Sequence, residues 1–144
     1  MFPWHGKGFG REASRSGPII IDIAQAAEEV SKVETVTVVL NVLEEHVEAF
    51  EAGFREHELP VWEDLKGRGL LVAATLNRMD ISSRPVAGAV QYLIAAIFAT
   101  GEGHQAHDAH PGFEAWNRIA DGYQTGDSLA FGGETVVKLG IESA

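Results

Sequence analysis

Four stretches of the sequence concentrate apolar residues in the manner of β-strands. Residues 35–42 (TVTVVLNV) place a valine or leucine at every second position, so one face of a strand there is wholly apolar. Residues 70–76 form a short apolar run, and residues 88–99 form a longer one that is apolar on both faces except at Gln91. Residues 134–141 supply a last strand, and the glycines before them an exit loop. The pattern therefore predicts four strands, the third of them central and covered.

Two segments between these strands change to helical spacing. From Glu44 onward apolar residues recur at helical intervals among glutamates, and Pro60 is expected to kink or restart this helix. Gly67 and Gly69 then end it. A second helix is expected to begin with Pro111 in its first turn. Its apolar stripe consists of Phe113, Trp116, Ala120 and Tyr123.

The first 34 residues have a different organisation. Residues 1–17 mix glycine, serine, charges and isolated aromatics without any period, which is typical of a mobile arm. Residues 18–23 are a short β-branched run, and residues 23–33 favour a helical turn or two. We therefore divide the chain into an N-terminal arm with an accessory strand and helix, residues 1–34, and one domain, residues 35–144.

The order strand, helix, strand, strand, helix, strand describes two βα units. It predicts an α+β fold of the ferredoxin-like βαββαβ type, with both helices on one face of a four-stranded antiparallel sheet. The expected second face is also apolar; it carries Val39, Leu71, Ala73, Leu93, Ala95, Ile97, Val137 and Leu139. An apolar face of that size needs a cover. We therefore expect a homodimer or a higher homo-oligomer packed face to face, with a cavity for a small ligand between each sheet and its own helices or rim loops.

Composition narrows the function further. The chain has 144 residues, a formal net charge of −10 and no cysteine. Without a basic cluster it is not expected to bind nucleic acid. Thiolate metal sites and thiol nucleophiles are excluded, so histidines and carboxylates must carry any chemistry. No run of apolar residues approaches membrane-spanning length, and a cytoplasmic protein without a membrane partner is the simplest expectation.

Half of the histidines lie in one short segment. His104, His107 and His110 recur every three residues, and on a helix the first and third cannot share a face. Because Pro111 also disfavours helical geometry at His110, we expect no metal site here. His104 and His107 are expected on a solvated helix edge. His110 is either at the rim of a cavity, where imidazole titrates usefully, or a structural helix cap.

Four other side chains are candidates for contacts with a ligand. Asn41 ends its strand on the less apolar face, where its amide either orients a ligand carbonyl or binds the following turn. Trp116 and Tyr123 belong to the apolar stripe of the second helix, so they are core residues or at most a cavity wall. Trp62 either closes the cavity mouth or packs on the kinked first helix.

The segment 106–116 (AHDAHPGFEAW), read with this order of elements, resembles the dimeric α/β-barrel superfamily over residues 35–141. The nearest members are the antibiotic-biosynthesis monooxygenases, with a segment of the form AHxxSPHFxAW, although here the proline follows the second histidine. The spacing also resembles that of plant-type polyketide cyclases, in which the second histidine is the base; this implies that role for His110. Haem-degrading members share an asparagine at the position of Asn41, but their axial histidine is not reproduced.

The resemblance implies a small cofactor-independent monooxygenase acting on a hydrophobic phenolic or polyketide-like compound, without metal or haem. His110 would take the phenolic proton and Asn41 would stabilise the developing oxyanion, while His107, Trp116, Tyr123 and Trp62 would contact the substrate. Two alternatives remain: a polyketide cyclase or isomerase of the same fold, and a non-catalytic dimer that is ligand-binding or stress-associated.

Overall fold

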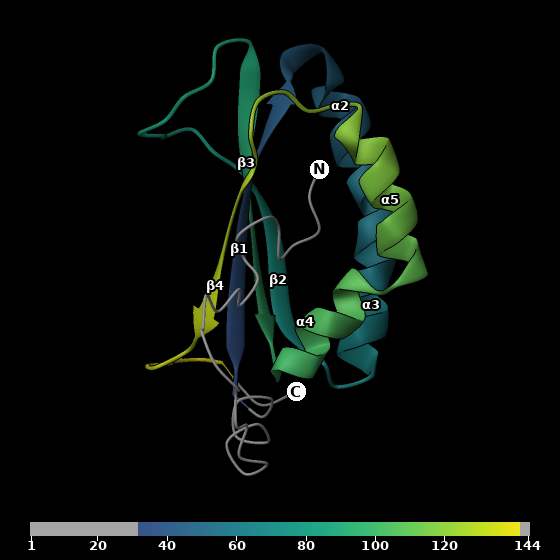
Figure 1. The fold of residues 1–144 in the computed structure, drawn as a ribbon, viewed down its shortest axis with the longest axis vertical. Helices are drawn as coiled ribbons and strands as arrows, with labels where there is room; N and C mark the ends of the chain where they lie inside the picture. Colours follow the sequence, from purple (N-terminus) through teal and green to yellow (C-terminus); the bar gives the residue numbers. More distant parts are fainter. Residues whose placement is uncertain (1–31, 142–144) are drawn as a thin grey trace, which may run out of the picture.

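The computed structural model describes residues 32–141. One sheet and a layer of helices make up this part of the chain (Figure 1). The strands are β1 (Glu34–Leu43), β2 (Leu71–Arg78), β3 (Ala89–Phe98) and β4 (Leu129–Glu134). The helices are the 3₁₀ turn η1 (Glu44–His46), α2 (Val47–Gly53), the π-helical turn η2 (Phe54–Glu58), α3 (Leu59–Gly67), α4 (Gly101–Asp108) and α5 (Pro111–Asp121). Most of the predicted N-terminal arm, with its accessory strand and helix, lies outside the described residues.

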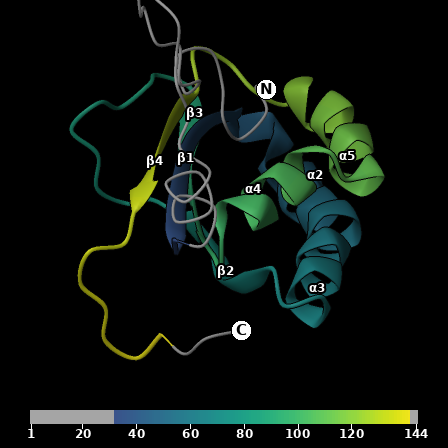
Figure 2. The ribbon, with the colours of Figure 1, turned by 60° about the horizontal axis from the view of Figure 1, so that its bottom comes forward.

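The four strands form one antiparallel sheet in the order β2-β3-β1-β4. All described helices lie on the same face of this sheet, and Figure 2 shows that face from a second direction. The predicted ferredoxin-like α+β fold is therefore confirmed. The apolar run of β3 is central, as its pattern predicted, because β3 pairs with β1 on one side and β2 on the other.

The core lies between the sheet and the helices. Alternate residues of β1 and β3 point into it, and large aromatic side chains of the helices meet them there. Its fully buried members include Val36, Leu40, Val42, Phe50, Leu65, Ala96, Phe98 and Ala120.

The last strand lies earlier in the chain than its sequence pattern indicated. The prediction placed it at residues 134–141, but β4 is Leu129–Glu134, and it pairs with β1 between Val39 and Glu34. β1 begins at Glu34, and the pairing ends just beyond it, where the Thr135 amide donates to the Val33 carbonyl at 3.0 Å. Gly132 and Gly133, expected in a loop, instead lie within the strand.

This shift also corrects the predicted second face of the sheet. Val137 and Leu139 are almost fully exposed in the segment after β4, so they belong to no sheet face. Leu71 is buried in the core, because the register of β2 shifts between Leu71 and Ala73 and turns the two residues to different faces.

The first helical segment is longer and less regular than a single α-helix. It runs without a break through α2, η2 and α3, and the irregularity precedes Pro60 as a π-helical turn. Proline lacks an N–H and collides with the carbonyl four residues before it, which explains why the normal helical ladder is interrupted there. Regular α-helical hydrogen bonding resumes at Leu59, next to Pro60, where the sequence predicted a kink or a restart of the helix.

Candidate functional site

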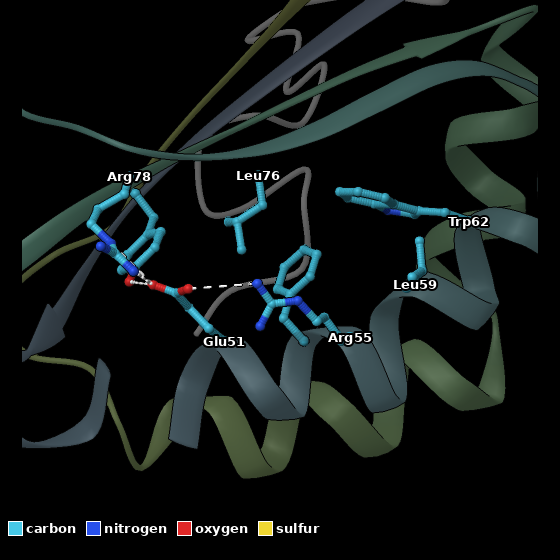
Figure 3. Close-up of a pocket in the computed structure, with 8 residues that line it drawn as sticks. Glu51, Arg55, Leu59, Trp62, Leu76 and Arg78 are labelled. Carbon is cyan, nitrogen blue, oxygen red and sulfur yellow. Dashed lines mark hydrogen bonds and ion pairs between the residues drawn. The ribbon is translucent and has the colours of Figure 1, made fainter. Parts of the chain in front are cut away.

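A cavity lies where the sequence pattern predicted one, between the sheet and its own helices (Figure 3). Its volume is ≈ 290 Å³, near the lower end of the range for small-molecule sites. The helical run α2–η2–α3 forms one wall, and the ends of β2 and β3 form the other. The lining side chains are Glu51, Phe54, Arg55, Leu59, Trp62, Leu76, Arg78 and Tyr92.

One end of the cavity carries a cluster of charged and polar groups. The Tyr92 hydroxyl donates to Glu51 Oε2 at 2.5 Å, and Arg78 Nε donates to the same oxygen at 3.0 Å. Arg78 Nη2 makes a second, shorter contact with that oxygen. Arg55 Nη2 lies 3.8 Å from the other carboxylate oxygen, Glu51 Oε1 (Figure 3). Two guanidinium groups therefore surround one carboxylate.

Local structure explains how these residues meet. Glu51 and Arg55 are four residues apart on the helical run, which places them on one face. Arg78 ends β2 directly opposite Tyr92 in the register with β3, so the two side chains leave the sheet together. The helical run and the two strands also pack against the same hydrophobic core, which holds them in place.

Glu51 is ionised and Tyr92 is neutral around neutral pH. The hydrogen bond from Tyr92, followed by that from Arg78, lowers the pKa of Glu51. Burial and the hydrogen bond to Glu51 raise the pKa of Tyr92. The cluster therefore presents two positive charges, one negative charge and a neutral phenol.

The rest of the cavity is apolar and largely aromatic. Phe54 and Trp62 pack edge to face with ring centroids 5.1 Å apart. Leu59 and Leu76 complete the walls from the helix and the sheet (Figure 3). A flat apolar body with a polar edge fits such a site. Of the substrate-binding residues predicted from the sequence, Trp62 lies here; its role in binding stays a prediction.

His110 lies outside the lining of this cavity. It is the N-cap of α5, and its Nδ1 accepts a hydrogen bond of 3.0 Å from the Gly112 amide. Its Nε2 lies 3.1 Å from Asp64 Oδ2 on α3. The geometry is that of the helix cap, the second of the two roles considered for this residue. Its role as a base stays a prediction.

Asn41 is buried on β1 and its amide is engaged at both ends. Its Oδ1 accepts from Gln91 Nε2 at 2.8 Å, and its Nδ2 donates to the Asp127 carbonyl at 3.1 Å. The amide thus ties β3 and the loop before β4 to the first strand. Its role at an oxyanion stays a prediction.

His107 and His104 are buried, not on a solvated edge as the spacing suggested. His107 Nε2 lies 2.5 Å from Glu58 Oε1, and its Nδ1 lies 3.0 Å from Asp108 Oδ1. His104 Nε2 lies 3.4 Å from Asp108 Oδ2, and its Nδ1 lies 2.7 Å from Glu34 Oε1. The five groups form a chain that alternates carboxyl and imidazole. Each imidazole contacts two carboxyl groups, and these contacts compensate for the loss of water around the buried polar rings.

The helix that carries these histidines packs very tightly. A Cβ at Gly103 of α4 would lie 2.4 Å from the Leu70 carbonyl oxygen, so only glycine permits this approach. The close approach turns His104 and His107 inward, where His104 stacks on Phe98 and His107 meets Phe113.

This burial also determines the protonation of the chain of groups. Burial raises the pKa of Glu58 more than the contact with His107 lowers it. Burial alone would lower the pKa of His104, but hydrogen bonds to Asp108 and Glu34 outweigh it and raise the value to about 9. For His107 as well, burial opposes the charge, and the bonds to Asp108 and Glu58 leave the pKa raised.

Trp116 takes the place expected of it on the apolar stripe of α5, whereas Tyr123 lies beyond the end of α5 at Asp121 and packs, partly buried, against the core. Trp116 is buried, and a Cβ at Gly53 would lie 2.5 Å from its ring, so α2 and α5 touch closely at this point. Half-buried His57 stacks on the Trp116 side chain, with ring centroids 5.6 Å apart. Tyr123 lies beside His46, with ring centroids 5.3 Å apart. Neither Trp116 nor Tyr123 lines the cavity, and their contacts with a substrate stay predictions.

The charged end of the cavity was missed by the sequence reading. The pair Glu51 and Arg55 was visible as a helical i,i+4 pair, but such pairs are common on solvated helix faces. Arg78 and Tyr92 meet only through the register of β2 with β3, which no local pattern specifies.

Within residues 32–141, no cluster of three or more histidines and carboxylates has an arrangement that would hold a metal ion. In the same part of the chain, no helix combines the length and the apolar character needed to cross a membrane.

Comparison with solved structures finds this fold in a group of small proteins. A proposed antibiotic biosynthesis monooxygenase from Nitrosomonas europaea superposes with a TM-score of 0.61 at 12% identity, over 76% of this chain and 96% of that protein. One from Caulobacter crescentus gives 0.61 at 16% identity, over 79% and 99%. SnoaB, a cofactor-independent oxygenase from Streptomyces nogalater, gives 0.54 at 17% identity, over 74% and 97%. The chain shares their fold.

No family model and no curated protein matches the sequence. The resemblance inferred from the sequence is thus confirmed at the level of the fold, while activity must be argued from the site itself.

Proposed function

We propose that this protein is a cofactor-independent, monooxygenase-like enzyme that acts on a small hydrophobic phenolic or polyketide-like compound. The observation that carries the proposal is the cavity, which combines aromatic walls with two guanidinium groups at one end. The fold shared with proteins named as monooxygenases, including a cofactor-independent oxygenase, supports it.

In this proposal the aromatic walls hold the flat body of the substrate and the arginines hold its oxygen. Arg55 and Arg78 stabilise the negative charge when the phenol or enol becomes an anion, whose carbanion character allows attack on dioxygen. Oxidation of an anthrone methylene, or of a naphthol ring C–H together with its hydroxyl, to the quinone level supplies four electrons. One oxygen atom enters the product and the other leaves as water, so no external reductant is needed.

The roles predicted for His110 and Asn41 are a separate part of this proposal. Both side chains are already hydrogen-bonded within the fold, to Asp64 and Gly112 for His110 and to Gln91 and Asp127 for Asn41. We assign the stabilisation of the anion to the arginines and treat the histidine base as a hypothesis to be tested by substitution.

We also propose that the protein forms a homodimer through the open face of its sheet. The strand registers place Val39, Leu93 and Phe131 on that face, together with Ala95 and Ile97. The side chain of Phe131 is 58% exposed, which is unusual for so large an apolar residue. Sedimentation equilibrium of the wild type and of Phe131→Lys tests this. A stable wild-type monomer at micromolar concentration contradicts it.

The enzymatic proposal is tested by oxygen uptake with a panel of anthrones, naphthols and hydroxyquinones. We expect Arg78→Gln to lower kcat/KM by roughly 10- to 100-fold, as for the loss of a hydrogen bond to a charged group of about 1.5–3 kcal/mol. Arg118→Gln is the matched control, because Arg118 is exposed on α5 and pairs only with Glu114 of its own helix among the described residues. Product formation without oxygen uptake would favour the cyclase alternative, and no binding or turnover of any compound would contradict the proposal.

A further inference from the structure

The charge balance at the end of the cavity points to a specific form of the ligand. Glu51 provides one negative charge, while Arg55 and Arg78 provide two positive charges. This cluster, taken by itself, therefore carries one net positive charge. A ligand that brings one negative charge completes it, whereas a neutral ligand leaves it unbalanced.

Both arginines have N–H donors beyond those that contact Glu51. Arg78 uses Nε and Nη2 on Glu51, and a guanidinium carries five N–H groups in all. The side chains of Arg55 and Arg78 are 72% and 59% exposed, in contrast with 18% for Glu51. Both guanidinium groups are therefore accessible at the open end of the cavity, and the carboxylate is the less accessible group.

None of the eight lining side chains is suited to remove a proton from the ligand. No histidine is among them. The three groups that face Glu51 are Arg78 from β2, Tyr92 from β3 and Arg55 from its own helical run. They hold the pKa of Glu51 low, and that of Tyr92 is raised, so neither group changes charge around neutral pH.

We propose that the cavity binds its ligand as a preformed monoanion, so that its substrates are planar aromatic enols or phenols acidic enough to ionise without a base from the protein. Hydroxyquinones, in which a hydroxyl is conjugated with a carbonyl, represent this acidity as ligands, and a substrate carries in addition the ring methylene or C–H that dioxygen oxidises. This inference rests on the proposed function, because it concerns the same cavity. It adds that proton removal belongs to the substrate, and that the protein selects and orients the anion.

Two ligands of equal shape test it. A 2-hydroxy-1,4-naphthoquinone is an anion at neutral pH, and its methyl ether cannot ionise. Isothermal titration calorimetry at pH 7 should show the hydroxy compound binding at least 10-fold more tightly than the ether. Raising the salt concentration should weaken binding of the hydroxy compound alone, since screening acts on the charge.

Two substitutions at the cluster should act in opposite directions. Arg78→Gln should weaken binding of the hydroxy compound at least 10-fold and change binding of the ether less than 3-fold. Glu51→Gln should strengthen binding of the hydroxy compound, because it removes the competing negative charge. Arg118→Gln should change neither affinity. Thermal melts of each variant establish that it is folded.

Equal affinity for the hydroxy compound and its ether would overturn the inference, as would weaker binding of the hydroxy compound by folded Glu51→Gln. If the neutral ether binds equally well and naphthols are still oxidised, only this inference fails and the proposed function stands. If neither compound binds and no member of the oxygen-uptake panel reacts, both fail.

Discussion

Glu51 and Glu58 lie two helical turns apart on the same run of helix, yet their surroundings give them opposite properties. At the open end of the cavity, Tyr92 and Arg78 lower the pKa of Glu51. In the dry core, burial raises the pKa of Glu58, which is fully buried beside His107. The same residue type therefore serves two purposes, according to whether water and a ligand can reach it.

The π-helical turn between the two glutamates contributes to this separation. It inserts an extra residue into the helical turn at Phe54–Glu58, which changes the direction in which later side chains project. Glu51 faces the ends of β2 and β3, whereas Glu58 contacts His107 on α4. We propose that the Glu51 cluster is the ligand site, whereas the Glu58 chain of groups connects η2, α4 and β1.

The largest expected effect is on stability and comes from breaking the buried pair. His107→Ala leaves the Glu58 carboxyl without its imidazole partner in the core, which should cost about 3–5 kcal/mol in the free energy of unfolding. Urea denaturation measures the loss. The double variant Glu58→Leu/His107→Leu should be less destabilised than His107→Ala, because no unpaired charge remains. A His107→Ala variant as stable as the wild type would show that the pair does not hold the core.

The next effect concerns pH and the other end of the same chain of groups. The pKa of His104 is raised from 6.5 to about 9, so the folded state holds this proton more tightly than the unfolded state does. The stabilisation is complete below pH 6.5 and is lost as the pH rises through 9; at most it amounts to about 3 kcal/mol. Urea denaturation at a series of pH values from 6 to 10 measures this loss in the free energy of unfolding.

His104→Gln is the control for this pH dependence. Its stability should fall less than that of the wild type between pH 6.5 and 9, and the fall that remains comes from His107, whose pKa is also raised. A wild type that becomes more stable between pH 6.5 and 9 would contradict the direction assigned to His104.

A smaller effect separates the two hypotheses for His110. His110 is the N-cap of α5, so His110→Ala should lower the free energy of unfolding by about 1 kcal/mol. His110→Asn should keep the wild-type stability, because asparagine is a good N-cap. Neither variant should alter turnover if the residue is only a cap. If His110 is the base, both variants should lose roughly 10²-fold or more in rate while His110→Asn stays stable.

The smallest effect is expected at the exposed cluster. Arg78→Gln should change the free energy of unfolding by less than about 1 kcal/mol, because the ion pair with Glu51 is open to solvent and is screened. Urea denaturation of Arg78→Gln and His107→Ala under the same conditions compares the two losses in the free energy of unfolding. A loss as large as that of His107→Ala would mean that the cluster at the cavity is structural as well.

The fold was accessible from the sequence because it depends on local patterns. The alternation in β1 and the continuous apolar run of β3 specify strands, and the stripe on α5 specifies a helix. The last strand was misplaced because Gly132 and Gly133 resemble a loop, although pairing with β1 tolerates them. Helix α4 did not enter the predicted order, since its glycines and histidines have little helical propensity and it forms by packing on Leu70.

The site was less accessible, because it depends on contacts between distant segments. Trp62 was identified as a candidate at the cavity, but Arg78 and Tyr92 are brought to Glu51 only by strand register. The histidines drew attention for their chemistry, whereas the structure uses His107 and His104 inside the core with carboxyl partners. Those carboxyl partners, Glu58 and Glu34, are far from the histidines in sequence and could not be paired with them in advance.

A crystal structure of the protein grown with 2-hydroxy-1,4-naphthoquinone tests the central claim most directly. The quinone should lie between Trp62 and Leu76, with its ionised oxygen within hydrogen-bond distance of Arg78. The Glu58 and His107 side chains should remain in contact beneath it. A ligand bound instead against His110, or one that separates Glu58 from His107, would contradict the assignment of the two regions.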